Sequence, residues 1–460
     1  MRAPLPLAGL TLAARLAGSL SRAAGRGGGT TLPGKIVSKV DPTAVSRLAA
    51  RLPHGSAVLS ATNGKTTTAA MTAEILRGRV RLAHNSSGAN LVSGVASTLL
   101  SANGAELGLF EVDEAALPEV ARLVRPRVLC LSNLFRDQLD RYGELELLAE
   151  RWRLLVHELP ADATLVVNGD DPQLGDLIRE RPGVVFGLDD PAQARAGLQH
   201  AADSKYCVRC GSPYRFHAAY VGHLGDYECP ACGHARPPLE ISARAVELHG
   251  LDAAEFDLAT PEGTRRVRLP LPGLYNVYNA LAAAALARAL GATLDQVQAG
   301  LERFGAAFGR FERIPVGERR VLMLLIKNPA GANEAIRTLV AGGAPTLAVA
   351  LIALNDAIAD GKDVSWIWDV DFEPLLERLD RVVVSGDRAA ELALRFKYAG
   401  FDPGAIEVVP DLARALDRGL EIIPATGELM VLPTYTAMLE LRRIVAERGH
   451  VRNYWEERAA

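Results

Sequence analysis

A loop with a phosphate-binding pattern stands near residue 60, where the sequence runs AVLSATNGKTTTAAM. An apolar stretch typical of a strand leads into it, and a helical pattern begins at its lysine. Unpaired N–H groups at a helix start attract anions, and glycine lets the backbone approach a phosphate closely. We therefore expect Gly64 to form the turn, Lys65 to meet nucleotide phosphates, and the Thr66 hydroxyl to bind Mg²⁺. The full G-x-x-x-x-G-K-[ST] pattern is not met because residue 59 is Leu59, so a chance turn is the competing interpretation.

Three acidic residues follow the next strand-like segment: Glu111, Asp113 and Glu114, in FEVDE. In an open α/β sheet, ligands bind beyond the carboxyl ends of the strands. A carboxylate there could hold the metal ion of a nucleotide. A solvated acidic loop is the alternative that the sequence leaves open.

Four of the five cysteines form two C-x-x-C pairs, Cys207/Cys210 and Cys229/Cys232, and the fifth is Cys130. This spacing is typical of a structural Zn²⁺ site, in which four thiolates leave no coordination position for catalysis. The surrounding segment has few basic residues, so we expect no nucleic-acid partner, and a redox role for either pair is the weaker explanation. The metal should stabilise a module too small to form its own core.

The bulk composition fits an ordinary globular protein of two to four domains, with 460 residues, 49% hydrophobic and 23% charged residues and a net charge of -3. The N-terminal segment 1–34 has leucines at helical spacing, but Arg15 and Arg22 interrupt its apolar run. We expect an amphipathic helix there, packed on its own domain or lying on a membrane surface. The expected location is the cytoplasm, with a peripheral place at the inner face of the plasma membrane as the alternative.

Apolar runs that alternate with helical patterns predict an α/β fold with mostly parallel sheets. The first unit should span residues 35–314, with the zinc module inserted at 205–236, and a second α/β unit should span 315–460. Predicted strands include Ala57–Ala61, Leu107–Val112 and Val128–Leu131 in the first unit, and Val321–Ile326 and Leu347–Leu354 in the second. The longest predicted helices are Glu144–Glu158 and Asn276–Leu290.

The ordered segments SATNGKTTT, HNSSGANLVSGVASTL, FEVDE, SNLFRDQLDRYGE, VVNGDDP and GLYNVYNALAAA resemble the Mur ligase family. The zinc insert, LIKNPAGANE and LNDAIADGKDVSWIWD resemble the amidating branch of that family, over nearly the whole chain. The resemblance implies a Mur-type P-loop central domain and a Rossmann-like C-terminal domain.

The resemblance also implies a reaction. ATP would phosphorylate the α-carboxylate of D-glutamate in the stem peptide of lipid II, and ammonia would convert the acyl phosphate to D-isoglutamine. A separate glutaminase subunit of the GatD type would release the ammonia from glutamine. The cysteines support such a partner, because four are assigned to zinc and Cys130 lies in an apolar run where a buried, inert thiol is expected.

Site residues follow from the resemblance position by position. The phosphate loop would comprise Asn63, Gly64, Lys65, Thr66 and Thr67, with Mg²⁺ held by Thr66 and Glu111. Asn279 would lie near the adenine, Arg310 would close the hinge onto ATP, and Asn168 and Asp171 would belong to a nucleotide-side motif. Lys65 and Glu111 would thus be catalytic.

In the ADGKD segment, a carboxylate would orient the catalytic histidine of the glutaminase across the interface. Asp363 is the first choice, with Asp360 and Asp356 behind it, and an acidic turn before a Trp-containing helix is the alternative.

Three departures from the family pattern bear on the reaction. Ala61 replaces a usual glycine, so the loop must tolerate a Cβ. Gln138 and Arg153 replace the histidine and the carbamylated lysine of amino-acid-adding Mur ligases, which disfavours their second metal site. Two alternatives remain: an amino-acid-adding ligase, including the folylpolyglutamate type, and a regulatory P-loop NTPase whose zinc module docks another molecule.

Overall fold

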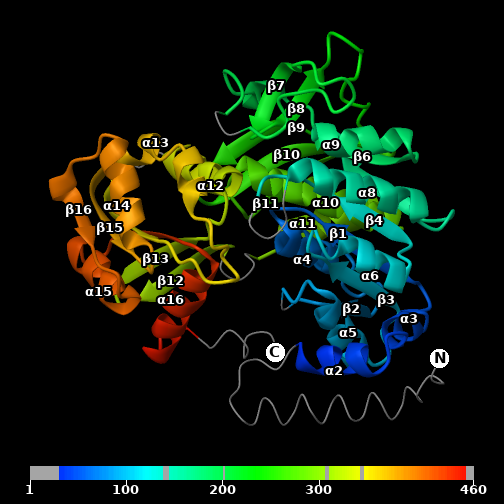
Figure 1. Cartoon of the computed structure of the whole chain (residues 1–460), viewed down its shortest axis with the longest axis horizontal. Helices are drawn as coiled ribbons and strands as arrows, with labels where there is room; N and C mark the ends of the chain where they lie inside the picture. Colours follow the sequence, from blue (N-terminus) through cyan, green and yellow to red (C-terminus); the bar gives the residue numbers. More distant parts are fainter. Residues whose placement is uncertain are drawn as a thin grey trace.

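The computed structural model describes residues 31–86, 88–137, 144–199, 202–305, 310–341 and 347–451. These residues form two α/β units side by side, with a small hairpin module on the first (Figure 1). The predicted α/β class is therefore confirmed. Most of the predicted N-terminal segment, residues 1–30, and also Gln138 lie outside the described residues. Among the described helices, none combines the length and the apolar character needed to cross a bilayer.

The first unit is built on a nine-stranded sheet with the order β11-β10-β9-β6-β5-β4-β1-β3-β2. The strands from β2 to β9 in this order run parallel, and β10 and β11 continue the sheet antiparallel. The strands are β1 (Ser56–Ser60), β2 (Leu82–His84), β3 (Leu107–Glu111), β4 (Val128–Leu131), β5 (Thr164–Asn168), β6 (Gly183–Leu188), β9 (Ile241–His249), β10 (Ala253–Thr260) and β11 (Gly263–Leu269). Because helices cover both faces, every residue of β1, β3 and β4 is buried.

One helix, α10 (Leu274–Ala289), runs through the middle of the first unit and is buried on all sides from Asn276 to Ala287. Its alanines let it lie close both to the sheet and to α4 (Lys65–Ile75), the helix that follows the phosphate loop. The remaining helices of this unit are α2 (Leu32–Val40), α3 (Ala44–Ala49), α5 (Val92–Ser101), α6 (Leu117–Val124), α8 (Leu145–Glu158), α9 (Pro172–Gly175), η1 (Asp176–Arg179), η2 (Pro191–Gln193) and α11 (Leu294–Arg303).

The second unit has a six-stranded sheet with the order β12-β13-β17-β14-β15-β16, in which only β12 runs antiparallel to its neighbour. Its strands are β12 (Arg310–Val316), β13 (Arg319–Leu324), β14 (Leu347–Ala353), β15 (Leu379–Ser385), β16 (Ile406–Val408) and β17 (Glu428–Pro433). Its helices are α12 (Pro329–Ala341), η3 (Ser365–Asp369), α13 (Glu373–Leu376), α14 (Ala389–Tyr398), η4 (Pro403–Ala405), α15 (Leu412–Ile422) and α16 (Tyr435–Glu447). Helix α12 lies between the two sheets (Figure 1).

The predicted boundary between residues 314 and 315 stays a prediction. Strand β12 spans it and pairs with the second sheet from Arg310 onward. Phe311 has a positive φ of 73°, unusual for a bulky residue, next to a register shift in the β12–β13 pair. One strained backbone position thus lies where the chain passes from one unit to the other.

Trp152 joins α8 to the acidic loop after β3, because it is fully buried and its Nε1–H donates to the carbonyl of Glu114 at 3.0 Å. We expect Trp152→Ala to remove about 3–5 kcal/mol of stability through the cavity it leaves. A thermal melt should then show the first transition lowered by roughly 10 °C. Leu147→Ala on the exposed side of the same helix is the matched control and should change it little. Equal shifts for both variants would contradict this packing.

Candidate functional site

Gly64 ends the loop after β1 in the left-handed region, with φ +85°, and α4 begins at the next residue. A Cβ on Gly64 would lie 1.9 Å from Oδ1 of Asn279, so a larger residue would push the loop away from α10. Thr68 Oγ1 donates to the same oxygen at 3.4 Å, and Asn279 Nδ2 donates to Asn276 Oδ1 at 3.1 Å. The structure therefore brings the predicted loop and the predicted asparagine into contact. Ala61 is not among the residues with positive φ, so its Cβ adds no backbone strain.

Lys65, the loop lysine, is buried and its ammonium group is surrounded by oxygen atoms. Its Nζ lies 2.6 Å from Oε2 of Glu114 and also donates to the carbonyl of Ala61. A phosphate that binds this lysine must therefore share it with Glu114 or replace that carboxylate. Glu114 belongs to the acidic trio for which the sequence predicted only a carboxylate that could hold a metal ion, so its ion pair with Lys65 was not foreseen.

Glu111 is the last residue of β3 and is buried next to the loop that follows β2. The amide of Asn85 fixes its backbone from both sides: Nδ2 donates to the Glu111 carbonyl at 2.8 Å, and Oδ1 accepts from the Glu111 N–H at 3.0 Å. In register, Glu111 is paired with Leu59 on β1, one strand from the phosphate loop. A buried carboxylate at this edge fits a hard cation such as Mg²⁺. Thr66, the other predicted ligand, is half-buried in the first turn of α4.

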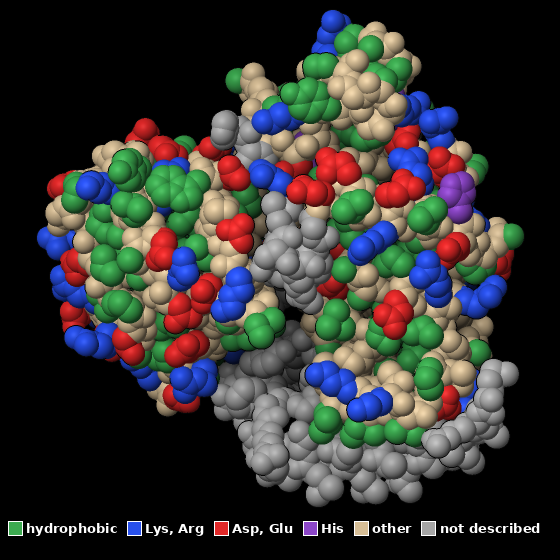
Figure 2. Space-filling view, viewed as in Figure 1, with side chains coloured by type: hydrophobic (Ala, Val, Ile, Leu, Met, Phe, Trp, Pro, Cys, Tyr) green, Lys and Arg blue, Asp and Glu red, His purple; other side chains and the backbone are tan. Residues whose placement is uncertain are grey.

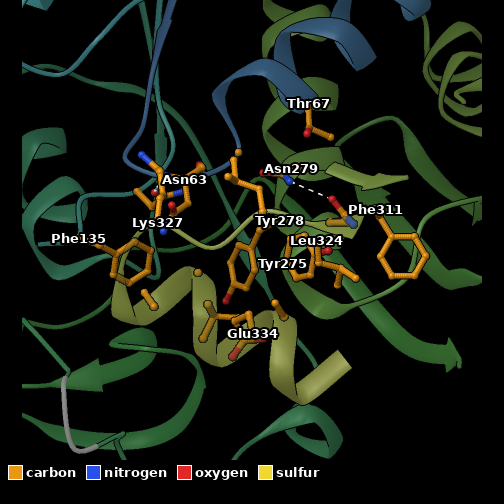
Figure 3. A pocket seen from close by; sticks show the side chains of 18 of the residues that line it. Asn63, Thr67, Phe135, Tyr275, Tyr278, Asn279, Phe311, Leu324, Lys327 and Glu334 are labelled. Atoms are coloured by element: carbon orange, nitrogen blue, oxygen red, sulfur yellow. Dashed lines mark hydrogen bonds between the residues drawn. The ribbon is translucent and has the colours of Figure 1, made fainter. Parts of the chain in front are cut away.

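An open cleft with about 900 Å³ of empty space begins at the phosphate loop. The loop, α10, strands β12 and β13 and α12 supply its walls, so both units contribute (Figure 3). Asn63 and Lys327 lie toward one end of the cleft and Phe311 toward the other (Figure 3). The lining combines apolar and aromatic side chains with a few amides: Asn63, Thr67, Tyr275, Asn276, Asn279, Phe311 and Leu324. Such a wall suits a flat heterocycle bound next to a phosphate site.

The other predicted nucleotide residues are placed differently. Asn168 is buried, and its Nδ2 donates to the carbonyl of Ser132 at 2.9 Å. Asp171 caps α9 and accepts the Leu134 N–H at 2.9 Å. Neither residue lines the cleft, so in the described structure both hold the ends of β4 and β5 together. Arg310 is the first residue of β12, and its side chain is outside the described part.

A pair of reciprocal amide hydrogen bonds joins the phosphate loop to the second unit. Asn63 Nδ2 donates to Asn328 Oδ1 at 3.2 Å, and Asn328 Nδ2 donates back to Asn63 Oδ1 at 3.0 Å. Beside this pair, Lys327 Nζ contacts Asp137 Oδ2 at 2.5 Å. Lys327 and Asn328 lie in the LIKNPAGANE segment, whose individual residues have no role that the sequence pattern alone predicts.

A second, smaller cavity lies on the other side of Lys327 and contains the predicted partner-facing carboxylate. It is lined by Arg136, Asp137, Lys327, Asn328, Pro329, Asp360, Asp363, Ser365, Trp366 and Asp369. Asp363 is exposed and accepts the Ser365 N–H at 2.8 Å, and hydrogen bonds from Ser365 hold the pKa of Asp363 below its usual value.

Asp360 and Asp356, the two alternatives to Asp363, have partners within the second unit. Asp360 is buried and accepts both the N–H and the hydroxyl of Thr436. Asp356 is half-buried and lies 3.4 Å from Arg388 and 3.7 Å from Lys362. Asp363 is thus the one of the three whose carboxylate faces outward.

The four cysteines of the C-x-x-C pairs meet at the base of the hairpin β7 (Arg215–Val221) and β8 (Leu224–Glu228). Cys207 Sγ lies 3.6 Å from Cys232 Sγ, and Cys210 Sγ lies 3.5 Å from Cys229 Sγ. All four sulfurs lie within 4.8 Å of one another. A tetrahedral zinc ion with Zn–S bonds of about 2.3 Å places its sulfurs about 3.8 Å apart. The cluster could therefore hold zinc.

Asp176 joins this module to the first unit. Its carboxylate is buried and lies 2.6 Å from Arg209, within the first C-x-x-C pair, and 2.9 Å from Arg153 on α8. Burial works to raise the pKa of Asp176, but hydrogen bonds from Arg209 and Arg153 outweigh it and keep this pKa below its usual value. Arg153 therefore pairs with the same carboxylate as Arg209 of the cysteine module.

Comparisons with known proteins identify the family to which the two α/β units belong. The family model of the Mur ligase middle domain matches residues 60–227, and the model of the MurT ligase C-terminal region matches residues 325–438. The described fold is similar to a pseudomurein peptide ligase type C from Methanothermus fervidus, with a TM-score of 0.70, 20% identity and coverage of 87% of this chain and 80% of that one. It is also similar to MurF ligase from Thermotoga maritima in complex with ADP, with a TM-score of 0.64, 15% identity and coverage of 93% and 85%.

Two curated relatives match over most of their length. The lipid II isoglutaminyl synthase (glutamine-hydrolyzing) subunit MurT of Streptococcus pneumoniae is 34% identical over 93% of this chain and 94% of its own. The subunit of the same name from Staphylococcus aureus strain N315 is 32% identical, over 92% and 94%. The expected Mur-type fold and the resemblance to the amidating branch are thereby confirmed. The chain belongs to the MurT family of Mur-type ligases.

Proposed function

We propose that this chain is the ligase subunit that amidates the α-carboxylate of D-glutamate in the stem peptide of lipid II, as part of peptidoglycan synthesis. The observation that carries the proposal is the phosphate loop closed by Gly64 against Asn279, at the mouth of a cleft walled by both units. Membership in the MurT family favours the amidating reaction over the addition of an amino acid. Arg153, at the position where the resemblance expects a carbamylated lysine in amino-acid-adding ligases, is paired with Asp176, which supports the same choice.

The phosphates of ATP would bind at Asn63, Gly64, Lys65, Thr66 and Thr67, where the N-terminus of α4 offers N–H groups. The adenine would occupy the cleft beside Asn276 and Asn279. Thr66 and Glu111 would hold Mg²⁺, which supplies charge neutralisation for the phosphoryl group. Lys65 would exchange Glu114 for phosphate oxygens, and Arg310 would act at the hinge as the units close.

A carboxylate is a poor electrophile, and its conversion to an acyl phosphate makes its carbon reactive. The protein contributes positioning and charge stabilisation, which are the main terms in phosphoryl transfer. Because water would destroy an acyl phosphate, the cleft between the units must close over it. The Asn63–Asn328 pair shows that the second unit already contacts the phosphate loop.

Ammonia would come from a separate glutaminase subunit of the GatD type. The names of both curated relatives describe glutamine-hydrolyzing synthase subunits. None of the five cysteines is a suitable nucleophile, because four cluster and Cys130 is buried, where burial raises the pKa of its thiol far above the usual value. We assign Asp363 to orient the partner's catalytic histidine. Exposed Ile358 and Trp368, a few residues to either side, offer apolar contact area for the partner.

Replacing the loop lysine tests the ligase activity. Lys65→Ala should lower ATP-dependent amidation of lipid II by at least about 100-fold, because the developing phosphoryl charge loses its cation. Mass spectrometry of lipid II, incubated with ATP, Mg²⁺ and an ammonium salt, measures the conversion of carboxylate to amide. Since the change leaves Glu114 buried and unpaired, Lys65→Ala/Glu114→Gln should give the same result in a better-folded protein. Lys39→Ala, on the exposed side of α2, should retain activity, and retained activity in Lys65→Ala would refute the proposal.

Asp363→Asn separates the partner's reaction from that of this chain. With glutamine as the nitrogen source, amidation should fall by about 100-fold or more, since the partner's histidine loses its orienting carboxylate. With an ammonium salt, amidation should change several-fold at most. Asp356→Asn is the matched comparison, and a glutamine-specific loss in that variant instead would move the role to Asp356.

The cysteine cluster is proposed to hold structural zinc. Metal analysis of the purified chain should find about one equivalent of zinc. Cys229→Ser should lose the metal and lower the melting temperature by several degrees, because the hairpin module has only a small core of its own. Cys130→Ala should keep the zinc. A zinc-free protein with unchanged stability would show that the cluster has another use.

A further inference from the structure

The two cavities of the interface between the units meet at one ion pair. Lys327 lines both of them, and Asp137, its partner at 2.5 Å, lines the smaller one. The outer rim of the smaller cavity carries Asp363, the residue assigned above to the partner's site. Asp137 and Asp363 thus line the same cavity, and Lys327, the partner of Asp137, also lines the nucleotide cleft.

Asp137 has one carboxylate oxygen whose environment is unusual. The residue is 9% exposed, and Oδ2 is the atom that contacts Lys327. The other oxygen, Oδ1, is buried and receives no hydrogen bond from any residue in the described part of the chain. A buried carboxylate oxygen that accepts no hydrogen bond is unfavourable, so this atom suits a ligand that donates one.

The charges around Asp137 favour a small cation. Four carboxylates line this cavity, those of Asp137, Asp360, Asp363 and Asp369, against the two cations Arg136 and Lys327. Arg136 is already paired with Asp203 at 2.5 Å and with Asp369 at 3.3 Å. An ammonium ion has four N–H donors and fits both the excess of carboxylates and the donor that Oδ1 lacks.

The groups that face Asp137 also set its proton affinity. Burial raises the pKa of Asp137 and Glu114 acts in the same direction, while Lys327 and Lys65 oppose them, and the net shift is upward. A carboxylate that binds protons more readily than usual is a better base near neutral pH.

We propose that Asp137 binds ammonium from the smaller cavity and accepts one of its protons, so that neutral ammonia enters the ligase site. The inference rests on the proposed function, because an acyl phosphate must be there to receive the ammonia. Ammonium has no lone pair and cannot attack a carbonyl carbon. After transfer of one N–H proton to Oδ1, the nitrogen lone pair forms the C–N bond. The C–O bond to phosphate then breaks, phosphate leaves with that electron pair, and the nitrogen loses a second proton.

Comparing two nucleophiles isolates this step. Hydroxylamine is mostly neutral at pH 7 and needs no base, whereas ammonia is then almost wholly protonated. In the full chain, purified with its glutaminase and supplied with lipid II, ATP and Mg²⁺, Asp137→Asn should still form the hydroxamate at a near wild-type rate. Its amidation with ammonium chloride should fall by about 100-fold at pH 7. The loss of amidation in Asp137→Asn should become smaller toward about pH 9.5, where free ammonia becomes abundant.

Two controls accompany the variant. Asp137→Glu keeps a carboxylate and should recover much of the amidation at pH 7. Asp41→Asn neutralises a buried carboxylate paired with Arg47, outside both cavities, and should change neither reaction. If Asp137→Asn does not fold, the wild-type pH profile decides. If Asp137 acts as the base, the wild-type rate of amidation at a fixed total ammonium concentration should rise by much less than about tenfold per pH unit between about pH 7 and 9.

Several results would overturn the inference: an unimpaired Asp137→Asn, equal losses of hydroxamate and amide, or a wild-type rate that rises in parallel with free ammonia. Equal losses of hydroxamate and amide would mean that Asp137 acts in the formation of the acyl phosphate instead. A wild-type protein that forms neither hydroxamate nor amide from lipid II would refute the proposed function itself, so the two failures are distinguishable.

Discussion

Gly64 holds its left-handed turn directly against the amide of Asn279, with no room between them for even one carbon atom. The phosphate loop therefore has its shape only when α10 lies in place behind it. Helix α10 can lie there because a run of alanines lets it pass through the interior between the sheet and α4. The same helix lines the cleft with Tyr275 and Asn276, so one contact fixes the phosphate end and the adenine end of the proposed ATP site together.

The second constraint is electrostatic. Lys65 is buried beside Glu114, and the backbone of Glu114 is in turn held by Trp152 of α8. A nucleotide must compete with that carboxylate for the lysine, while Asn328 of the second unit already bonds to Asn63 of the loop. The ion pair of Lys65 with Glu114 and the contact of Asn63 with the second unit therefore lie two residues apart in the same loop. The strained Phe311 lies where the chain crosses between the units, a suitable place for a hinge. On the face shown in Figure 2, basic and acidic side chains are interspersed over both units.

Local patterns in the sequence predicted the local parts of the site. The strand, loop and helix around residue 64 form as the motif requires, and the two C-x-x-C pairs form matching turns in which Gly211 and Gly233 take a positive φ. Contacts between distant segments could not be derived from spacing alone. Thr68 and Asn279 are 211 positions apart, and Asn63 and Asn328 are 265 apart. Asn279 was found through the family resemblance, whereas Asn328, Lys327 and Asp137 stood within quoted segments but had no role until the fold placed them at one interface.

The proposed reaction requires ATP to pass its terminal phosphoryl group to a carboxylate of the substrate. Lipid II labelled with ¹⁸O in the D-glutamate α-carboxylate reports this transfer. During ATP-dependent amidation, we expect one carboxylate oxygen of each amidated stem to leave with the released inorganic phosphate, which mass spectrometry detects as phosphate carrying one ¹⁸O atom. Amide formation with unlabelled phosphate would contradict it, because the carboxylate would then have been activated without an acyl phosphate.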